Sequence, residues 1–269
     1  MVPLAARRRW LFGRAHGYAL PSLPQTFSEK VQWRILHDRR PLIRLTGDKL
    51  QMKAYAAAHS TQVRVPETLW SGVDLEGIID RDWGGNWVLK PISGWGFAAF
   101  GTGSLRSSGI DLRVVRRWRF DTPGLHGEWV YSEGEPGYLI ERRIEQADGG
   151  IPNDLKCWVF GGRTRLIFTS IPRSLGQGHR FYSPAWEPLS FCRADVPLSA
   201  IETAPEHLAE VVAIADELGA AYDFIRVDLY DTPSGVWFGE LTPYPAGGLK
   251  RFEPVAADLE LGSWWSLPD

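Results

Sequence analysis

The clearest hydrophobic pattern in the chain predicts a helix over residues 203–219. Apolar residues recur there with the spacing of one helical face: Leu208, Val211, Val212, Ala215 and Leu218. Thr203 is the expected N-cap, because Glu206 three positions later completes a capping box, in which two side chains satisfy backbone N–H groups. Gly219 stands where such a helix would end.

Alternating apolar and polar residues after this helix predict a hairpin. The pattern divides into a strand over 223–230, a turn over 231–235 and a strand over 236–241. Successive side chains of a strand point to opposite faces, so Arg226 and Asp228 share one face while the apolar residues Ile225, Val227 and Leu229 share the other. A turn centred on Pro233 sets Arg226 opposite Glu240 and leaves Asp228 diagonal to Glu240 on the same face.

Weaker patterns predict the elements of the preceding part of the chain. They are a helix over 28–37, a helix that follows 47–49 and ends near 59, a strand over 86–90 before a glycine-rich stretch over 93–103, and strands over 137–144, 155–160 and 165–170. A Gly161-Gly162 turn joins the last two strands as a hairpin. Helices that alternate with hairpins predict a mixed α and β protein, of the α+β class.

The composition is that of a globular chain with a sizeable core. Of 269 residues, 44% are hydrophobic and 23% are charged, which excludes disordered and fibrous classes. No uncharged stretch reaches the ~20 residues of a membrane helix. The net charge of −2 argues against a nucleic-acid partner. The start of the chain lacks the apolar region of a secretory signal, so we expect a cytoplasmic protein.

The polar face of the predicted hairpin brings one arginine and two carboxylates together. An ion pair between Arg226 and Glu240 leaves Asp228 beside a like charge, which costs free energy. A divalent cation would remove the repulsion, and magnesium commonly takes one or two protein carboxylates while substrate phosphates complete its shell. On this pattern alone, a magnesium site and a pair of exposed carboxylates both remain open. Thr242 continues the same face.

Two lysines stand where they could meet phosphate groups. Lys90 ends an apolar strand and precedes the loop Ser93-Gly94-Trp95-Gly96-Phe97, whose backbone N–H groups suit an anion. The loop lacks the GKS or GKT ending of a Walker loop. Lys49 stands at the expected start of a helix, where an anion is also favoured. Each lysine taken singly is equally well explained as a solvated side chain.

The order of these features along the chain resembles that of the ATP-grasp superfamily. In closer detail, the chain is similar to the teichuronopeptide-biosynthesis-type (TupA-like) ATP-grasp family over nearly its whole length. The segments that carry the resemblance are Ser28-Glu-Lys-Val-Gln-Trp33, His37-Asp-Arg-Arg-Pro41, Gly47-Asp-Lys49, Val65-Pro-Glu-Thr-Leu-Trp70, Trp87-Val-Leu-Lys-Pro91, Asp223-Phe-Ile-Arg-Val-Asp-Leu-Tyr230 and Phe238-Gly-Glu-Leu-Thr-Pro-Tyr-Pro245.

This resemblance implies two α+β lobes that grip ATP, and a reduced N-terminal segment. The expected division is an N-terminal helical and basic segment over 1–46, a first lobe with the glycine-rich loop over 47–136, and a second lobe with the hinge and the hairpin over 137–269. The implied activity is that of an ATP- and Mg²⁺-dependent carboxylate-amine ligase, acting through an acyl phosphate on small-molecule or peptide substrates. Cell-envelope or secondary-metabolite assembly is the expected setting.

The resemblance also implies roles for individual residues. Lys49, Lys90 and the loop residues Ser93, Gly94 and Gly96 would hold phosphates, as would Lys156. Glu141 and the backbone from Arg142 to Ile144 would lie on the adenine hinge, and Asp154 would face the ribose. Asp228 and Glu240 would bind magnesium, with Thr242 near them, and Arg226 would neutralise the transferring phosphoryl group. His179 and Arg180 would meet a phosphate or the acid substrate.

Two departures from the family and three other functions stay open. Thr242 stands where many ATP-grasp enzymes have asparagine, and Trp95 lies inside a loop where a small residue is expected. An ATP-grasp phosphotransferase that forms no amide would use the same nucleotide site. The 13 tryptophans, which core packing also explains, leave room for a glycan-acting enzyme that uses Asp228 and Glu240, or for a binding module without catalysis.

Overall fold

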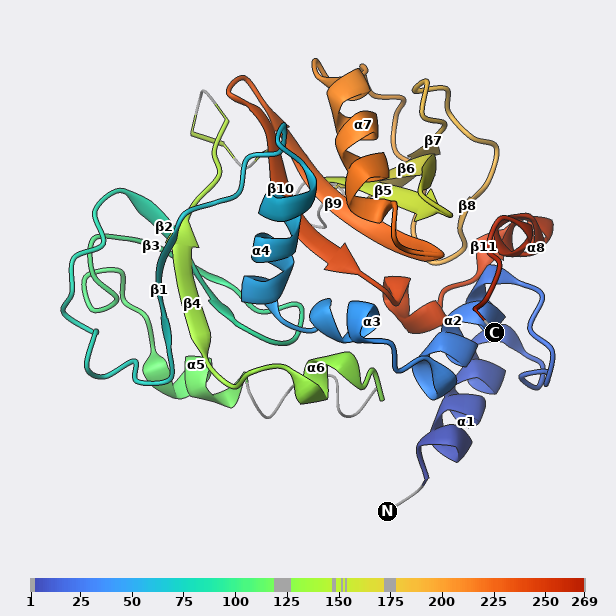
Figure 1. Cartoon of the computed structure of the whole chain (residues 1–269), viewed down its shortest axis with the longest axis horizontal. Coiled ribbons are helices and arrows are strands. Elements are labelled where there is room, and N and C mark those ends of the chain that lie inside the picture. The colour runs from blue at the N-terminus through green and yellow to red at the C-terminus, as the bar shows by residue number, and fades with distance from the viewer. Residues whose placement is uncertain are drawn as a thin grey trace.

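A computed structural model describes residues 3–118, 127–146, 149–150, 152, 154–171 and 178–268 (Figure 1). Two large antiparallel sheets with separate hydrophobic cores organise these residues, and a small third sheet pairs Cys192–Arg193 with Phe252–Glu253, which confirms the α+β class. Helix α4 lies between the two sheets, and the N-terminal helices gather near the C-terminal helix at one end of the larger sheet (Figure 1). None of the helices in this described part has the length and apolar character needed to span a lipid bilayer.

The smaller sheet has four strands in the order β1-β4-β2-β3. They are β1 (Thr68–Gly72), β4 (Tyr138–Arg142), β2 (Asn86–Pro91) and β3 (Ala99–Thr102). The expected strands over 86–90 and 137–144 are confirmed as β2 and β4 with small changes of length. Strand β4 comes after residue 136, where the sequence predicted the second lobe to begin. It nevertheless pairs with β1 and β2, so the segment assigned to the second lobe contributes a strand to the smaller sheet.

The larger sheet has five strands in the order β10-β9-β5-β6-β7. They are β5 (Asp154–Phe160), β6 (Arg163–Ile171), β7 (Gly178–Tyr182), β9 (Phe224–Thr232) and β10 (Gly235–Thr242). The hairpin turn at Gly161-Gly162 is confirmed, with both glycines at positive φ of 54° and 75°. Helix α7 (Leu208–Gly219) packs across β9, β5 and β6 (Figure 1) and buries Val211, Ile214, Ala215 and Leu218.

The remaining elements surround the two sheets. They are α1 (Leu4–His16), α2 (Phe27–His37), α3 (Pro41–Leu45), α4 (Lys49–His59), α5 (Leu112–Arg117), α6 (Val130–Glu133), β8 (Cys192–Arg193), the 3-10 helix η3 (Pro245–Gly248), β11 (Phe252–Glu253) and α8 (Ala256–Ser263). The expected helices over 28–37 and up to residue 59 are confirmed as α2 and α4. Asp48 caps α4 by accepting from the N–H groups of Leu50 and Gln51.

The expected start of the 203–219 helix is wrong. Helix α7 begins at Leu208, and no side chain forms a capping box there. The carboxylate of Asp231, from the end of β9, meets the helix start instead: its oxygens lie 2.6 Å from His207 Nδ1 and 3.4 Å from the His207 backbone N. The preceding chain is drawn to the sheet, because the Tyr182 hydroxyl accepts from the Glu202 N–H at 2.9 Å. A tertiary contact therefore replaces the local cap.

The register expected for the β9–β10 hairpin is also wrong. Gly235 pairs with Thr232, so the turn is shorter than the five residues expected. This register alone would place Glu240 on the apolar face, because a shift of one residue exchanges the two faces of a strand. A β-bulge between Phe238 and Glu240 shifts the register again and sets Glu240 opposite Asp228. The two carboxylates share one face, as expected, but through a different pairing.

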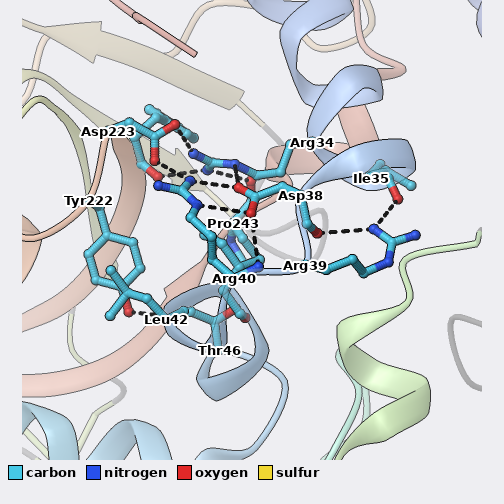
Figure 2. A network of polar contacts seen from close by, with 12 residues as sticks. Arg34, Ile35, Asp38, Arg39, Arg40, Leu42, Thr46, Tyr222, Asp223 and Pro243 are labelled. Carbon is cyan, nitrogen blue, oxygen red and sulfur yellow. Dashed lines mark hydrogen bonds and ion pairs between the residues drawn. The ribbon is translucent and has the colours of Figure 1, made fainter. Parts of the chain in front are cut away.

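A buried polar network holds the N-terminal helices to the larger sheet (Figure 2). Arg34 of α2 is fully buried and donates to Asp223 Oδ2 at 2.5 Å and to the Phe224 carbonyl oxygen at 2.7 Å. Arg40 bridges the carboxylates of Asp38 and Asp223. A buried charge must be paired and hydrogen-bonded, so these contacts fix α2 against the start of β9, the first strand of the carboxylate hairpin.

Candidate active site

A cavity of about 190 Å³ lies between the two sheets and is lined by eight of the expected site residues. Helix α4 supplies Lys49, Met52 and Lys53, the smaller sheet supplies Lys90 and Glu141, and the larger sheet supplies Asp154, Lys156, Arg226, Asp228, Tyr230, Gly239 and Glu240. Among these described lining residues, five side chains are cationic and four are acidic. The cavity therefore carries a small excess of positive charge, which suits a polyanion.

Arg226 lies at the centre of the carboxylate hairpin. Its Nε and Nη2 donate to the two oxygens of Asp228 at 2.6 and 2.7 Å, and Nη2 also donates to Glu240 Oε1 at 3.0 Å. The Thr242 hydroxyl donates to the same Glu240 oxygen at 3.0 Å. The guanidinium thus stands between two carboxylates that would otherwise repel each other.

The two carboxylates have different environments. Burial raises the pKa of the Asp228 carboxyl above its ordinary value, against the opposing charges of Arg226 and Lys156. Burial acts in the same direction on Glu240, but Arg226, Lys49 and Lys156 outweigh it and the pKa of Glu240 falls below its ordinary value. The Glu240 side chain is 35% exposed, whereas that of Asp228 is 4% exposed. Glu240 is therefore the carboxylate more open to a ligand.

A buried glutamate holds two lysines on the opposite wall. Glu141 Oε1 lies 2.7 Å from Lys90 Nζ, and Oε2 lies 2.8 Å from Lys53 Nζ. Burial would raise the pKa of Glu141, yet the two lysines outweigh burial and lower it. Lys53 did not emerge from the sequence patterns. Its spacing of four residues from Lys49 places both on one face of α4, and this is the signal that could have found it.

Lys49 and Lys156 complete the cationic lining. Burial lowers the pKa of Lys49 to about 8, and its Nζ donates to the Gly94 carbonyl oxygen at 2.5 Å, which ties α4 to the glycine-rich loop. Lys156 is opposite Asp228 on the neighbouring strand and forms ion pairs with Asp154 and, at 3.6 Å, with Asp228. Each cation has an acidic or carbonyl partner that a phosphate could replace.

The glycine-rich loop faces a different neighbour from the one its composition suggests. The Ser93 hydroxyl donates to the Tyr131 carbonyl oxygen at 2.7 Å, and Trp95 Nε1 donates to Glu128 Oε2 at 2.8 Å. Gly94 and Gly96 have positive φ values of 101° and 81°, so a side chain at either position would be strained. The loop is thus tied to the cavity through the bond from Lys49 to Gly94, while Trp95 donates to Glu128.

Eight expected residues are not among those that line the cavity: Ser93, Gly94, Gly96, Arg142, Ile144, His179, Arg180 and Thr242. Arg142 reaches the carbonyl oxygens of Trp83 and Gly84 at 3.3 and 3.2 Å, and Ile144 follows the end of β4. Arg180 donates to the Ser199 carbonyl oxygen, and His179 Nε2 accepts from the Arg193 N–H at 2.8 Å. Both lie on β7, the edge strand beyond β6. Their roles toward nucleotide or acid stay predictions.

The residues of the hairpin fit a magnesium ion that shares its shell with phosphates. In the described part of the chain, no group of three or more His, Cys, Asp or Glu side chains is arranged to hold a metal. Asp228 and Glu240 nevertheless lie opposite each other on neighbouring strands and face one cavity. Two carboxylates are a ligand set that magnesium accepts when substrate oxygens supply the rest.

A second and smaller cavity, of about 50 Å³, adjoins the first at Arg226. Aromatic residues form much of its wall: Phe27, Trp158, Phe168 and Phe252. Arg193 and Lys250 add positive charge, and Pro245, Ala246 and Gly248 form a side made of backbone and small groups. Trp158 is opposite Arg226 in the sheet, so the same sheet face runs from the lysine-lined cavity into the aromatic one. Arg226 is the side chain that both cavities share.

The chain places a cavity of lysines and paired carboxylates between two antiparallel sheets, and comparison with family models assigns it to the ATP-grasp class. The family model of TupA-like ATP-grasp proteins matches residues 29–265 of this sequence. The chain therefore belongs to the TupA-like ATP-grasp family. This result confirms the resemblance that the sequence motifs indicated.

Solved structures of ligases are similar to this chain at low identity. A D-alanine–D-alanine ligase from Bacillus anthracis in complex with ATP is 14% identical, with a TM-score of 0.44, and 75% of this chain covers 54% of that protein. The ATP-grasp ligase PsnB, in complex with a minimal precursor, is 12% identical (TM-score 0.41; 76% and 53% covered). An L-amino acid ligase from Bacillus licheniformis is 12% identical (TM-score 0.45; 88% and 48% covered).

This chain spans about half the length of each of these three proteins. The search of curated proteins found no match to the sequence.

Proposed function

We propose that this protein is an ATP-dependent ligase that joins a carboxylate to an amine through an acyl phosphate. The observation that carries the proposal is the cavity between the sheets, where Lys49, Lys53, Lys90 and Lys156 surround a paired Asp228 and Glu240. Four lysines suit a triphosphate, and the two carboxylates suit the magnesium ion that accompanies it. Membership of the TupA-like ATP-grasp family supports the same conclusion.

Each group of residues has a defined task in this proposal. The lysines hold the phosphates, and Glu141 keeps Lys53 and Lys90 in place through its two ion pairs. Asp228 and Glu240 would bind Mg²⁺, which supplies positive charge beside the β- and γ-phosphates when it is bound. Thr242 orients Glu240 through its hydroxyl. Arg142, Ile144 and Asp154 remain the proposed contacts of the nucleoside.

Arg226 connects the nucleotide to the acid. We place the carboxylate substrate in the second cavity, because Arg226 borders both cavities and its guanidinium can neutralise charge on the phosphoryl group in flight. A carboxylate oxygen would attack the γ-phosphorus and ADP would leave. An amine would then attack the acyl carbon, with release of orthophosphate and a proton.

Trapping with hydroxylamine tests this reaction without knowledge of the amine. The protein would be incubated with ATP, Mg²⁺, hydroxylamine and each of the twenty proteinogenic amino acids, small dicarboxylic acids and hydroxy acids. Hydroxamate formation that requires both ATP and one class of acid supports the ligase. A stable phosphorylated product that forms equally well without any amine or hydroxylamine would favour the phosphotransferase alternative. No hydroxamate and no affinity for MgADP in calorimetry would refute the proposal.

The sugar-hydrolysis alternative gives no task to the cationic wall. Asp228 and Glu240 share one arginine, and Lys49, Lys90 and Lys156 line the same cavity. Glycoside hydrolysis needs a carboxylic acid that can donate a proton to the substrate, whereas both oxygens of Asp228 accept from Arg226 and only 4% of its side chain is exposed. The arrangement here therefore supports phosphate chemistry instead.

A further inference from the structure

The N-terminal helix α1 sets a buried arginine against the loop that follows β10. Arg8 is fully buried, and its Nε and Nη2 donate to Gln32 Oε1 at 2.9 and 2.6 Å. Nη2 also donates to the Gly247 carbonyl oxygen at 2.5 Å. Burial lowers the pKa of Arg8 to about 10, so the guanidinium stays charged at neutral pH. A buried charge needs such partners, and here the partners belong to the loop and to α2.

The loop itself has an unusual backbone that must be held from outside. Ala246, Gly247 and Gly248 are three consecutive residues with positive φ values of 51°, 60° and 62°. Such a conformation is unfavourable for alanine and persists only when its surroundings fix it. Gln32 Nε2 donates to the carbonyl oxygens of Gly247 and Gly248 at 2.8 and 3.3 Å, and His16 Nε2 lies 3.0 Å from the Gly248 oxygen.

The opposite side of this loop lines the second cavity. Pro245, Ala246 and Gly248 border that cavity together with Arg226. None of these three loop residues is among the described residues that line the lysine-rich cavity. A displacement of the loop would therefore change the space beside Arg226 without removing a group from the nucleotide site.

We infer that Arg8 is a positioning residue for the carboxylate substrate, because it fixes the Pro245–Gly248 wall of the second cavity through Gln32 and Gly247. The inference rests on the proposed function, since it takes that cavity as the site of the acid. Helix α1 precedes residues 29–265, the part of the chain that the family model matches. The family pattern consequently assigns nothing to Arg8.

A second contact extends this arrangement to the glycine-rich loop. Glu128 is buried beside Arg8, whose positive charge opposes the rise that burial causes in the pKa of Glu128. Trp95 of the glycine-rich loop donates to Glu128 Oε2, and a Cβ built on Gly247 would lie 2.9 Å from Glu128 Oε1. One buried cluster thus contacts the loops on both sides of the reaction site.

The test compares Arg8→Met with Arg9→Met, which changes an exposed arginine of the same helix. The probes are MgATP, hydroxylamine and the acid of the panel above that gives the strongest hydroxamate signal. For Arg8→Met we expect the KM for the acid to rise at least about tenfold, because a misplacement of ~1 Å at a distant residue can cost about 100-fold. The KM for ATP should rise clearly less than the KM for the acid, since Arg8 reaches the glycine-rich loop only indirectly, through Glu128 and Trp95.

Two further variants distinguish a specific effect on the acid site from a general loss of folding. Gln32→Glu keeps the acceptor for Arg8 but removes both donations to Gly247 and Gly248, so it should raise the KM for the acid in the same way. Arg8→Lys, which retains one charged donor, should restore part of the affinity for the acid. Equal rises of the two KM values in Arg8→Met and Gln32→Glu would overturn the inference and indicate a structural role.

Hydrogen exchange separates failure of this inference from failure of the proposed function. The amides of Gly247 and Leu249 donate to Tyr244 and Ala246 within the loop. Their exchange in the presence of MgADP should be faster in Arg8→Met than in wild type and Arg9→Met. If wild type forms no hydroxamate with any acid, the proposed function fails; unchanged exchange in Arg8→Met would by itself overturn the role of Arg8.

Discussion

Glu240→Gln removes one negative charge from the Arg226 cluster while it keeps the size of the side chain. The carboxylate accepts one hydrogen bond from Arg226 and one from Thr242, both at 3.0 Å. The glutamine oxygen can still accept both, and Arg226 retains its two bonds to Asp228. Because the side chain is 35% exposed, we expect a loss of at most about 1 kcal/mol in the free energy of unfolding. Such a loss corresponds to a fall of roughly 2–4 °C in Tm.

The same change should act far more strongly on the reaction. If Glu240 binds Mg²⁺, its neutral replacement weakens the metal next to the transferring phosphoryl group, where a metal supplies several kcal/mol. We therefore expect turnover to fall by at least about 100-fold. The affinity for MgADP should fall toward the affinity for ADP without metal. Calorimetry with and without Mg²⁺, together with thermal unfolding of the ligand-free protein, measures both effects.

Asp228→Asn is the matched comparison. The Asp228 side chain is 4% exposed and takes two bonds from Arg226, so its loss should cost on the order of 3 kcal/mol. The reasoning would be refuted if Glu240→Gln destabilised the fold as much as Asp228→Asn. An unchanged dependence of nucleotide affinity on Mg²⁺ in a folded Glu240→Gln variant would refute the metal role as well.

Three other outcomes are expected. Lys90→Met should weaken the binding of MgADP about tenfold, because a hydrogen bond to a charged group contributes ~1.5–3 kcal/mol. Arg113→Met, which changes an exposed side chain of α5, should leave the binding unchanged. Calorimetry measures both affinities. Trp95→Phe should leave MgADP affinity within about threefold, because the indole N–H donates to Glu128; a larger loss would place Trp95 at the nucleotide. Burial lowers the pKa of His179 to about 4, so the unfolded chain binds a proton there from about pH 6.5 downward and the folded chain does not. Stability should therefore fall between those values of pH, and Tm measured across pH 7 to 4.5 should fall less steeply for His179→Gln than for wild type.

The sequence alone determined those features that depend on neighbours in the chain. The apolar stripe of 208–218 predicted a helix, and the two-residue alternation of 224–230 placed Arg226 and Asp228 on one face of a strand. Lys49 and Lys90 were found because a helix start and a strand end have local signals. The order of these motifs along the chain indicated the family, because this order can be read directly from the sequence.

Contacts between distant parts of the chain could not be read from local patterns. The start of α7 moved to Leu208 because Asp231, from another element, meets it in place of Thr203. The β9–β10 turn is shorter than expected, which shifts the register of the hairpin by one residue. The bulge at Gly239, which no local pattern indicated, shifts the register again and places Glu240 on the same face as Asp228. Arg8 contacts a carbonyl 239 positions later in the chain. The periodicity of a sequence determines which side chains share one face of a helix or strand. Which other element packs against that face depends on packing, on the burial of charges and on hydrogen bonds that form only in the folded chain.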